Sequence, residues 1–206
     1  AASKAALLGL LRRDIPSLIP IRFPNGETLS LPVVDVQWGE ESVSAIVVKD
    51  AGDDPDVTHG HRIVSTIRFS SHPGIHFLQG EGVGKVTLPG LGLEIGGPAI
   101  NKVPRQMMEQ ELSALYQGGL DVTISVPDGR ELAKRTFNPK LGIVDGISII
   151  GTSGIVRPFS SEAFVEAIRR EIEVAQALGC THLVINSGAK SERYLKIEFP
   201  DLLPQA

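Results

Sequence analysis

Two neighbouring stretches set the architecture of the first part of the chain: Val43-Ser-Ala-Ile-Val-Val-Lys49 and Arg62-Ile-Val-Ser-Thr-Ile-Arg-Phe69. Both are rich in β-branched residues, and the second alternates polar with apolar side chains, which predicts two strands. Upstream, an Asn-Gly pair predicts a hairpin over residues 21–31, because this pair tolerates the positive φ angles of a tight turn. A further strand is expected at 33–38 and an amphipathic helix at 2–12.

The middle of the chain continues this mixture of strands and helices. Pro104 suits the first turn of a helix, and the apolar spacing behind it predicts a helix over residues 104–117. A strand is expected at 122–126, whereas 131–137 is compatible with either a helix or a strand. Residues 1–145 are therefore expected to form a hairpin-rich α+β domain.

The pattern changes from residue 146 onward. Gly146-Ile-Ser-Ile-Ile150 predicts a short buried strand, a helix capped by Ser160 or Ser161 follows, and residues 181–185 predict a second strand. This β-α-β order predicts a parallel sheet, so residues 146–206 are expected to begin an α/β, Rossmann-like domain. Two strands cannot make a sheet that is buried on both faces, and we therefore expect a truncated chain whose second domain is incomplete.

Composition excludes several classes of protein. The 206 residues carry a formal net charge of −4, which gives no support to nucleic-acid binding. No apolar run reaches the roughly 18 residues of a transmembrane helix, so no membrane partner is expected. The single cysteine, Cys180, has no partner for a disulfide within the chain, which favours a reduced, cytoplasmic protein.

An acidic loop joins the predicted strands at 43–49 and 62–69. Its sequence is Lys49-Asp-Ala-Gly-Asp-Asp-Pro-Asp-Val-Thr-His-Gly60. Crowded carboxylates raise one another's pKa, which is useful in acid–base chemistry, while the spacing of a calcium loop is missing. Asp54 and Asp56 flank a proline and are expected to form the turn. The alternative is a solvated Asp-rich turn without chemistry. The candidate catalytic residues are Asp50, Asp53 and His59.

Two glycine segments are candidates for binding a cofactor. Gly80-Glu-Gly-Val-Gly84 lets a backbone approach a nucleotide or adenosyl group, although no helix can follow it and a structural turn is the alternative. Gly151-Thr-Ser-Gly154 lies between a predicted strand and a predicted helix, where α/β sheets place ligands, with a tight βα turn as the alternative. The candidate cofactor-binding residues are Gly80, Gly82, Gly84, Gly151, Thr152, Ser153 and Gly154.

Asn101 and Arg105 stand four residues apart at the beginning of a predicted helix, where an anionic substrate group would be favoured. Helix capping by Asn101 beside a solvated Arg105 is the alternative. A metal site is suggested only by four imidazoles, and none has a carboxylate or cysteine at a recognisable ligand spacing. No protein-bound metal is therefore expected. These imidazoles belong to His59, His61, His72 and His76.

Several stretches occur together and in one order that resembles a known family. The family is the cobalt-precorrin-5B C1-methyltransferases of anaerobic cobalamin biosynthesis, and the resemblance runs from the first helix to about residue 165. The segments that carry it are Val48-Lys-Asp-Ala-Gly-Asp-Asp-Pro-Asp-Val-Thr-His-Gly60, Gly80-Glu-Gly-Val-Gly84, Gly97-Pro-Ala-Ile-Asn-Lys-Val-Pro-Arg105, Leu132-Ala-Lys-Arg-Thr-Phe-Asn-Pro-Lys-Leu-Gly-Ile143 and Gly146-Ile-Ser-Ile-Ile-Gly-Thr-Ser-Gly-Ile-Val156.

The resemblance implies methyl transfer from S-adenosylmethionine to carbon 1 of a tetrapyrrole, cobalt-precorrin-5B, which gives cobalt-precorrin-6A. It also implies that cobalt arrives inside the substrate and that the fold is not the ordinary methyltransferase fold. Members of the family carry a Gly/Thr/Cys-rich segment before the first helix and segments of the Gly-His-Ile-Gly-Lys and Asn-Thr-His-Ser types farther on. None of these occurs here.

A ligand pocket is expected between the two predicted domains, because domain junctions favour pockets. Its lining would come from the acidic loop over residues 50–59 and from the two glycine segments at 80–84 and 151–154. The alternative function is a non-catalytic module that binds a tetrapyrrole or a small anion. Nothing in the sequence indicates an oligomeric state.

Overall fold

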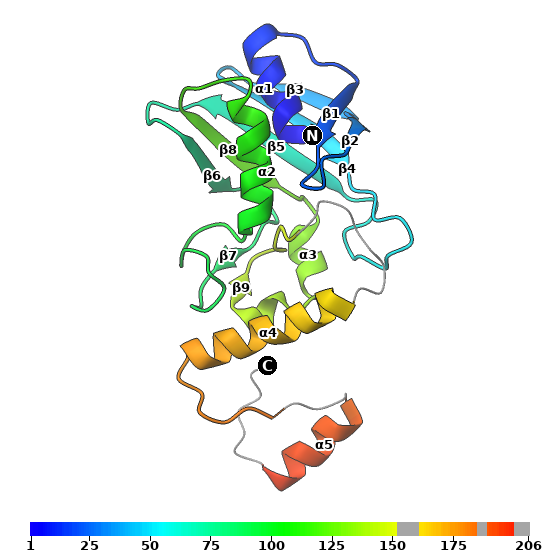
Figure 1. The fold of residues 1–206 in the computed structure, drawn as a ribbon, viewed down its shortest axis with the longest axis vertical. Helices are drawn as coiled ribbons and strands as arrows, with labels where there is room; N and C mark the ends of the chain where they lie inside the picture. Colours follow the sequence, from blue (N-terminus) through cyan, green and yellow to red (C-terminus); the bar gives the residue numbers. More distant parts are fainter. Residues whose placement is uncertain (152–160, 185–188, 200–206) are drawn as a thin grey trace.

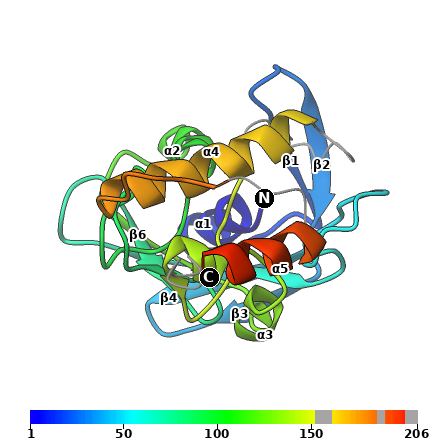
Figure 2. The ribbon, with the colours of Figure 1, turned by 90° about the horizontal axis from the view of Figure 1, so that it is seen from below.

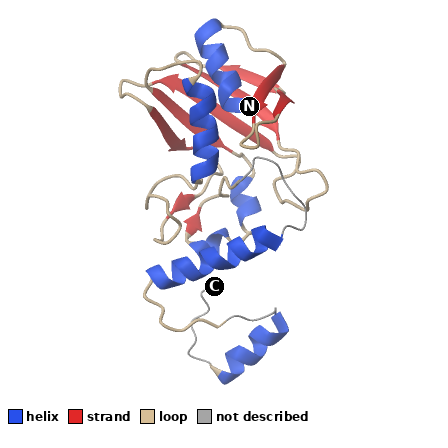
Figure 3. Ribbon diagram, viewed as in Figure 1, coloured by secondary structure: helices blue, strands red, loops and turns tan. Residues whose placement is uncertain are grey.

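The computed structural model describes residues 1–151, 161–184 and 189–199. They form a mixed α+β structure in which helices cover one face of a sheet (Figures 1 and 3). In chain order the elements are α1 (Ala2–Arg12), β1 (Leu18–Arg22), β2 (Thr28–Pro32), β3 (Asp35–Trp38), β4 (Ser42–Val48), β5 (Arg62–Phe69), β6 (Ile75–Gln79), β7 (Lys85–Val86), α2 (Lys102–Ser113), β8 (Leu120–Ser125), α3 (Gly129–Ala133), the 3₁₀ helix η1 (Asn138–Leu141), β9 (Ile143–Val144), α4 (Ser161–Ala177) and α5 (Ala189–Glu198).

The central sheet has five strands in the order β3-β4-β5-β8-β6. All neighbours are antiparallel except β6, which runs parallel to β8. The pairing of β4 with β5 places Val48 opposite Arg62, and the pairing of β5 with β8 places Val64 opposite Ser125. The acidic loop between β4 and β5 and the turn after β8 therefore lie at the same end of the sheet, where β4 and β8 finish.

The main core lies between this sheet and two helices. α1 packs against β4 and β5, and α2 lies beside α1. Side chains alternate along each strand, so Val43 and Ala45 are buried against the helices while Ser44 and Thr66 hydrogen-bond on the opposite face. Burial of each large core side chain, such as the fully buried Leu7, stabilises the fold by about 1.5–3 kcal/mol.

A smaller core anchors α4 against η1, β7 and β9, beyond the end of the central sheet (Figure 1). Val174 of α4 is buried together with residues of β7, β9 and η1, and the backbone of Gly90 lies directly against it. The other half of α4 keeps apolar surface exposed, since Phe164 and Val165 are 69% and 62% exposed. Figure 2 shows α4 and α5 from this side.

Most predicted elements of the first 145 residues are confirmed. The hairpin, the strands at β3, β4 and β5, and α1 occur where the sequence pattern places them. α2 begins two residues earlier than predicted, with Pro104 still in its first turn. The ambiguous segment 131–137 contains the end of α3, at residues 131–133, followed by a turn that leads to η1. β6 was not predicted, because its parallel partner β8 lies far along the chain and leaves no local signal.

The two strands predicted for the β-α-β unit do not form in the described residues. Residues 146–150 make only single parallel bridges, Ile147 with Val83 and Ile149 with Ile100, which join them to the first part of the chain. Residues 181–184 have no regular structure and are exposed, and residue 185 lies outside the described part. A strand requires partners for its backbone hydrogen bonds, and none of these pairings supplies a second parallel strand. The helix between them is confirmed as α4, whereas the domain boundary at 145/146 stays a prediction.

Candidate functional site

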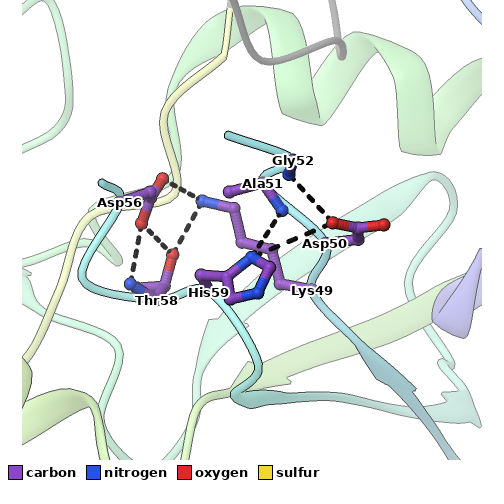
Figure 4. A network of polar contacts seen from close by, with 7 residues as sticks. All are labelled: Lys49, Asp50, Ala51, Gly52, Asp56, Thr58 and His59. Atoms are coloured by element: carbon purple, nitrogen blue, oxygen red, sulfur yellow. Dashed lines mark hydrogen bonds and ion pairs between the residues drawn. The ribbon is translucent and has the colours of Figure 1, made fainter. Parts of the chain in front are cut away.

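The acidic loop is held closed by one lysine. Lys49 Nζ donates to the Asp56 carboxylate and, at 2.7 Å, to the hydroxyl of the buried Thr58 (Figure 4). The Thr58 hydroxyl and backbone N–H both donate to Asp56 Oδ1. Backbone hydrogen bonds from Gly60 to Lys49 and from Lys49 to His61 continue the β4–β5 ladder into the loop. The loop therefore has a defined shape.

Asp56 is the electrostatic centre of this closure. Burial by itself raises the pKa of the Asp56 carboxyl, but the hydrogen bonds from Lys49 and Thr58 and the charge of Lys49 outweigh burial. The net pKa lies below its ordinary value, so Asp56 is ionised at neutral pH. Asp56 was expected to form the turn; its ion pair with Lys49, seven residues away, adds a role in closing the loop that the Lys–Asp spacing alone does not reveal.

The three candidate catalytic residues occupy the other side of the loop. Asp50 is 86% exposed and accepts the Gly52 N–H at 2.9 Å. His59 Nδ1 accepts the Ala51 N–H at 3.0 Å and lies 3.8 Å from Asp50 Oδ1 (Figure 4). Asp53 is exposed. The structure thus brings Asp50 and His59 together, with Asp53 in the same exposed turn.

His61 is hydrogen-bonded to a residue that the sequence did not predict as its partner. Its Nδ1 lies 2.9 Å from Oδ2 of Asp128, which precedes α3 in the turn after β8. The two residues are 67 positions apart, and no local motif joins them. The only signal in the sequence was the alternation of His59 with His61, which suggested a metal rather than a carboxylate partner.

The glycines of the first glycine segment are used for close packing inside the chain. A Cβ atom at Gly82 would stand 1.9 Å from the carbonyl oxygen of Val126, and one at Gly84 would stand 2.3 Å from Ile143. Gly129 and Gly146 each approach the carbonyl oxygen of Gly82 in the same way. The Cα side of this segment therefore faces closely packed backbone and side-chain atoms, which supports the structural turn as the reason for the glycines. Adenosyl binding by Gly80, Gly82 and Gly84 stays a prediction.

The pocket expected between the glycine segments is only partly described. Residues 80–84 contact the turn 126–129 through Gly82, and His61, just after the acidic loop, contacts the same turn through Asp128. Gly151 lies beside Pro104 of α2, with its Cβ position 4.0 Å from the proline ring. Thr152, Ser153 and Gly154 lie outside the described residues, so the pocket lining at this segment stays a prediction.

Asn101 is the N-cap of α2, but its side chain makes no capping hydrogen bond. With its amide oxygen turned toward α4, it accepts hydrogen bonds from both Nη atoms of Arg170, at 2.8 and 3.0 Å. Arg170 also donates to Glu166 on the same helix. The hydrogen bonds from Arg169 and Arg170 keep the pKa of Glu166 below its ordinary value. Asn101 therefore links the beginning of α2 to α4.

Arg105 is not the solvated side chain of the alternative interpretation. Its Nε donates to the carbonyl of Ile100 at 2.8 Å, one Nη donates to Pro98 at 3.2 Å, and the guanidinium lies over the Phe77 ring. It also lines a cavity of about 350 Å³ between the first turns of α2 and the loop after β7. The remaining residues of that cavity are Gly92, Leu93, Glu94, Lys102, Gln106 and Glu109.

Three other basic residues between positions 130 and 140 have acidic or aromatic neighbours. Lys134 pairs with Glu131, Arg130 lies 3.6 Å from Asp145, and Lys140 lies over the Phe137 ring. Among the described residues, no three His, Cys, Asp or Glu side chains gather in a way that could hold a metal ion. Within the same residues, no helix has the length and apolar character needed to cross a membrane.

Comparisons with known proteins point in one direction. The model of the CbiD family matches residues 1–158. A cobalt-precorrin-5B C(1)-methyltransferase from Geobacillus thermodenitrificans is 48% identical over 211 residues, which cover 100% of this chain and 57% of the relative. One from Pseudomonas aeruginosa is 47% identical over 197 residues, covering 93% of this chain and 54% of the relative.

A solved structure agrees with these relatives. The crystal structure of the cobalamin biosynthesis protein CbiD from Archaeoglobus fulgidus matches with a TM-score of 0.55 and 26% identity. The match covers 97% of this chain and 64% of that protein. The chain thus spans little more than half the length of the curated relatives that it matches.

Proposed function

Because the chain belongs to the CbiD family, we propose that it takes part in methyl transfer from S-adenosylmethionine to carbon 1 of cobalt-precorrin-5B. The observation that carries this proposal is the 48% identity over the whole chain to a relative bearing that activity in its name. The product would be cobalt-precorrin-6A. Cobalt would enter as part of the tetrapyrrole substrate and would need no ligand from the protein.

The acidic loop supplies the charge that a sulfonium donor requires. Asp50 and Asp53 are exposed carboxylates on the open side of the loop, and they would draw the positively charged donor toward it. His59 lies against Asp50 and would form the polar edge of the reaction site. The clamp formed by Lys49 and Asp56 holds these groups in place without taking part in the chemistry.

The cavity at α2 offers two cations, Lys102 and Arg105, to an acidic substrate, beside two carboxylates of its lining, Glu94 and Glu109. Arg105 uses Nε and one Nη for backbone carbonyls, which leaves other guanidinium N–H groups for a carboxylate. Lys102 lines the same cavity. Asn101 directly precedes Lys102 as the N-cap of α2. A volume of about 350 Å³ is small for a whole tetrapyrrole, so we assign the cavity to one carboxylate arm of the substrate.

Contacts to the adenosyl group are assigned on the sequence alone. The glycines at 80, 82 and 84 are closely packed against other atoms of the chain on their Cα side, which favours the second segment, Gly151-Thr-Ser-Gly154, as the cofactor loop. The α/β, Rossmann-like domain that this segment would begin and the cytoplasmic location remain parts of the same proposal. Both rest on the sequence patterns described above.

The test is transfer of a labelled methyl group from S-adenosylmethionine to cobalt-precorrin-5B by the protein as its gene encodes it. We expect label in a tetrapyrrole whose mass has risen by one methyl group. Asp53→Asn, which removes one charge and little volume, should lower the rate about tenfold, equivalent to about 1.4 kcal/mol. Glu40→Gln, at the opposite edge of the sheet, is the matched control and should leave the rate unchanged.

The second candidate function is a non-catalytic module that binds a tetrapyrrole or a small anion, favoured by Lys102 and Arg105 in the cavity at α2. It predicts a change in the absorbance of the tetrapyrrole on binding but no transfer of label. A normal rate in Asp53→Asn at unchanged stability would show instead that the acidic loop is scaffolding.

A further inference from the structure

Two histidines at the end of the acidic loop are hydrogen-bonded in opposite senses. His59 Nδ1 lies 3.0 Å from the backbone N–H of Ala51, and a backbone N–H can only donate. The Nδ1 atom of His59 must therefore carry the lone pair, and the proton of the neutral ring stands on Nε2. His59 presents a hydrogen-bond donor to whatever approaches its outer nitrogen.

The ring of His61 has the opposite arrangement. Its Nδ1 lies 2.9 Å from the Asp128 carboxylate, and an ionised carboxylate can only accept. The proton of the neutral His61 ring thus stands on Nδ1, which leaves the lone pair on Nε2. A carboxylate on one ring nitrogen that sets the tautomer at the other is the arrangement by which proteins orient an imidazole base.

Both partners of this pair stand on well-held backbone. The His61 N–H donates to Thr58, and its carbonyl accepts the Lys49 N–H at 3.0 Å. The carbonyl of Asp128 accepts two N–H groups of the first turn of α3. The side chain of His61 is 30% exposed and that of Asp128 is 67% exposed, which leaves part of the pair open to a ligand.

We propose that His61, rather than His59, is the proton acceptor of the reaction and that Asp128 is its positioning residue. This inference rests on the proposed function. In methyl transfer, the S–CH₃ bond breaks with its electron pair left on sulfur, and a π electron pair of the macrocycle forms the new C–CH₃ bond. The macrocycle gains the positive charge, and a proton conjugated with the methylated carbon leaves it for His61 Nε2. The resulting imidazolium is stabilised by the Asp128 carboxylate.

The first measurement needs no substrate. Nitrogen chemical shifts of the ¹⁵N-labelled protein report the protonation of each ring nitrogen. We expect the Nδ1–H tautomer at His61 and the Nε2–H tautomer at His59, and Asp128→Ala should convert His61 to a mixture of tautomers. His61 with its proton on Nε2 in the wild-type protein would overturn the inference, whatever the activity.

The second measurement uses His61→Asn, whose amide nitrogen can keep the hydrogen bond to Asp128 but offers no base at the position of Nε2. We expect kcat to fall by roughly 10²–10⁴-fold with the KM for S-adenosylmethionine unchanged. Added imidazole should restore part of kcat in His61→Gly. His72→Asn, on an exposed loop at the other edge of the sheet, is the control and should match the wild-type protein.

The outcomes separate the two proposals. A wild-type protein that transfers no methyl group would refute the proposed function, while the tautomers would still test the arrangement of the two rings. An active wild-type protein with an equally active His61→Asn variant would refute the inference alone. If His61→Asn fails to fold, the absence of imidazole rescue in a folded His61→Gly variant would count against it.

Discussion

Gly82 is the point at which three segments of backbone cross, and Gly82→Ala is the sharpest test of that packing. Gly82 has a φ of +68°, and the added Cβ would stand 1.9 Å from the Val126 carbonyl oxygen and 2.9 Å from the Gly129 nitrogen. The neighbours that would have to move are backbone atoms at the end of β8 and the beginning of α3. The Gly82 carbonyl also accepts the Ile147 N–H at 2.9 Å, so a shift would strain this contact too.

The expected cost follows from two effects. A left-handed conformation costs an L-residue roughly 1–2 kcal/mol. Overpacking against groups that cannot rotate away adds about 1–3 kcal/mol. Gly82→Ala should therefore lower the free energy of unfolding by about 2–5 kcal/mol, which is a large share of the 5–15 kcal/mol typical of a folded domain.

The assay is urea unfolding followed by far-ultraviolet circular dichroism, with Gly92→Ala as the control. Gly92 has nearly the same φ, +64°, but its Cβ would meet nothing within 4 Å. The free energy of unfolding of the control should fall by only about 1–2 kcal/mol, which is the conformational cost alone. Equal losses in the two variants would refute the crossing as the reason for glycine at position 82 and would leave the Gly80–Gly84 segment free for a role in ligand binding.

Three further predictions concern the loop and the helix contacts. Because the pKa of Asp56 lies below its ordinary value of 3.8, the stability it contributes is complete above that pH and is lost as the pH falls through the lower, folded-state pKa. The free energy of unfolding, measured between pH 2 and 6, should therefore fall less steeply with decreasing pH in Asp56→Asn than in the wild-type protein. An equally steep fall in both proteins would contradict the ion pair between Lys49 and Asp56. Asn101→Ala and Arg170→Met should each weaken the attachment of α4 and lower the free energy of unfolding. A double-mutant cycle measured by thermal unfolding should give a coupling free energy of about 0.5–2 kcal/mol between the two positions. Additive effects of the two substitutions would contradict the contact. Arg105→Lys loses the two hydrogen bonds to backbone carbonyls and should cost about 1–2 kcal/mol in thermal stability. The same variant should raise the KM for the tetrapyrrole while the KM for S-adenosylmethionine stays unchanged, and an unchanged tetrapyrrole KM would remove Arg105 from the substrate site.

Local patterns in the sequence are sufficient for most of the secondary structure. The Asn-Gly pair predicts the hairpin of β1 and β2, and the β-branched runs predict β4 and β5, because side-chain periodicity and turn chemistry act over a few residues. The resemblance to the family is likewise contained in the order of short segments. The same local patterns predicted strands at 146–150 and 181–185, but the described residues, 146–150 and 181–184, form neither, since an apolar β-branched run is compatible with a strand but does not provide its partner.

The contacts that define the candidate site depend on residues far apart in the chain. His61 contacts Asp128, and Gly82 contacts the turn after β8, because β8 pairs with β5 in the sheet. Asn101 contacts Arg170 because α4 packs through Val174 on the smaller core. Whether a histidine donates or accepts depends on the atom opposite each ring nitrogen, and residue type does not specify that atom. Sequence therefore identifies the groups that can carry chemistry, while tertiary packing determines their partners, because hydrogen bonds and steric contacts act over distances of a few ångströms in space rather than along the chain.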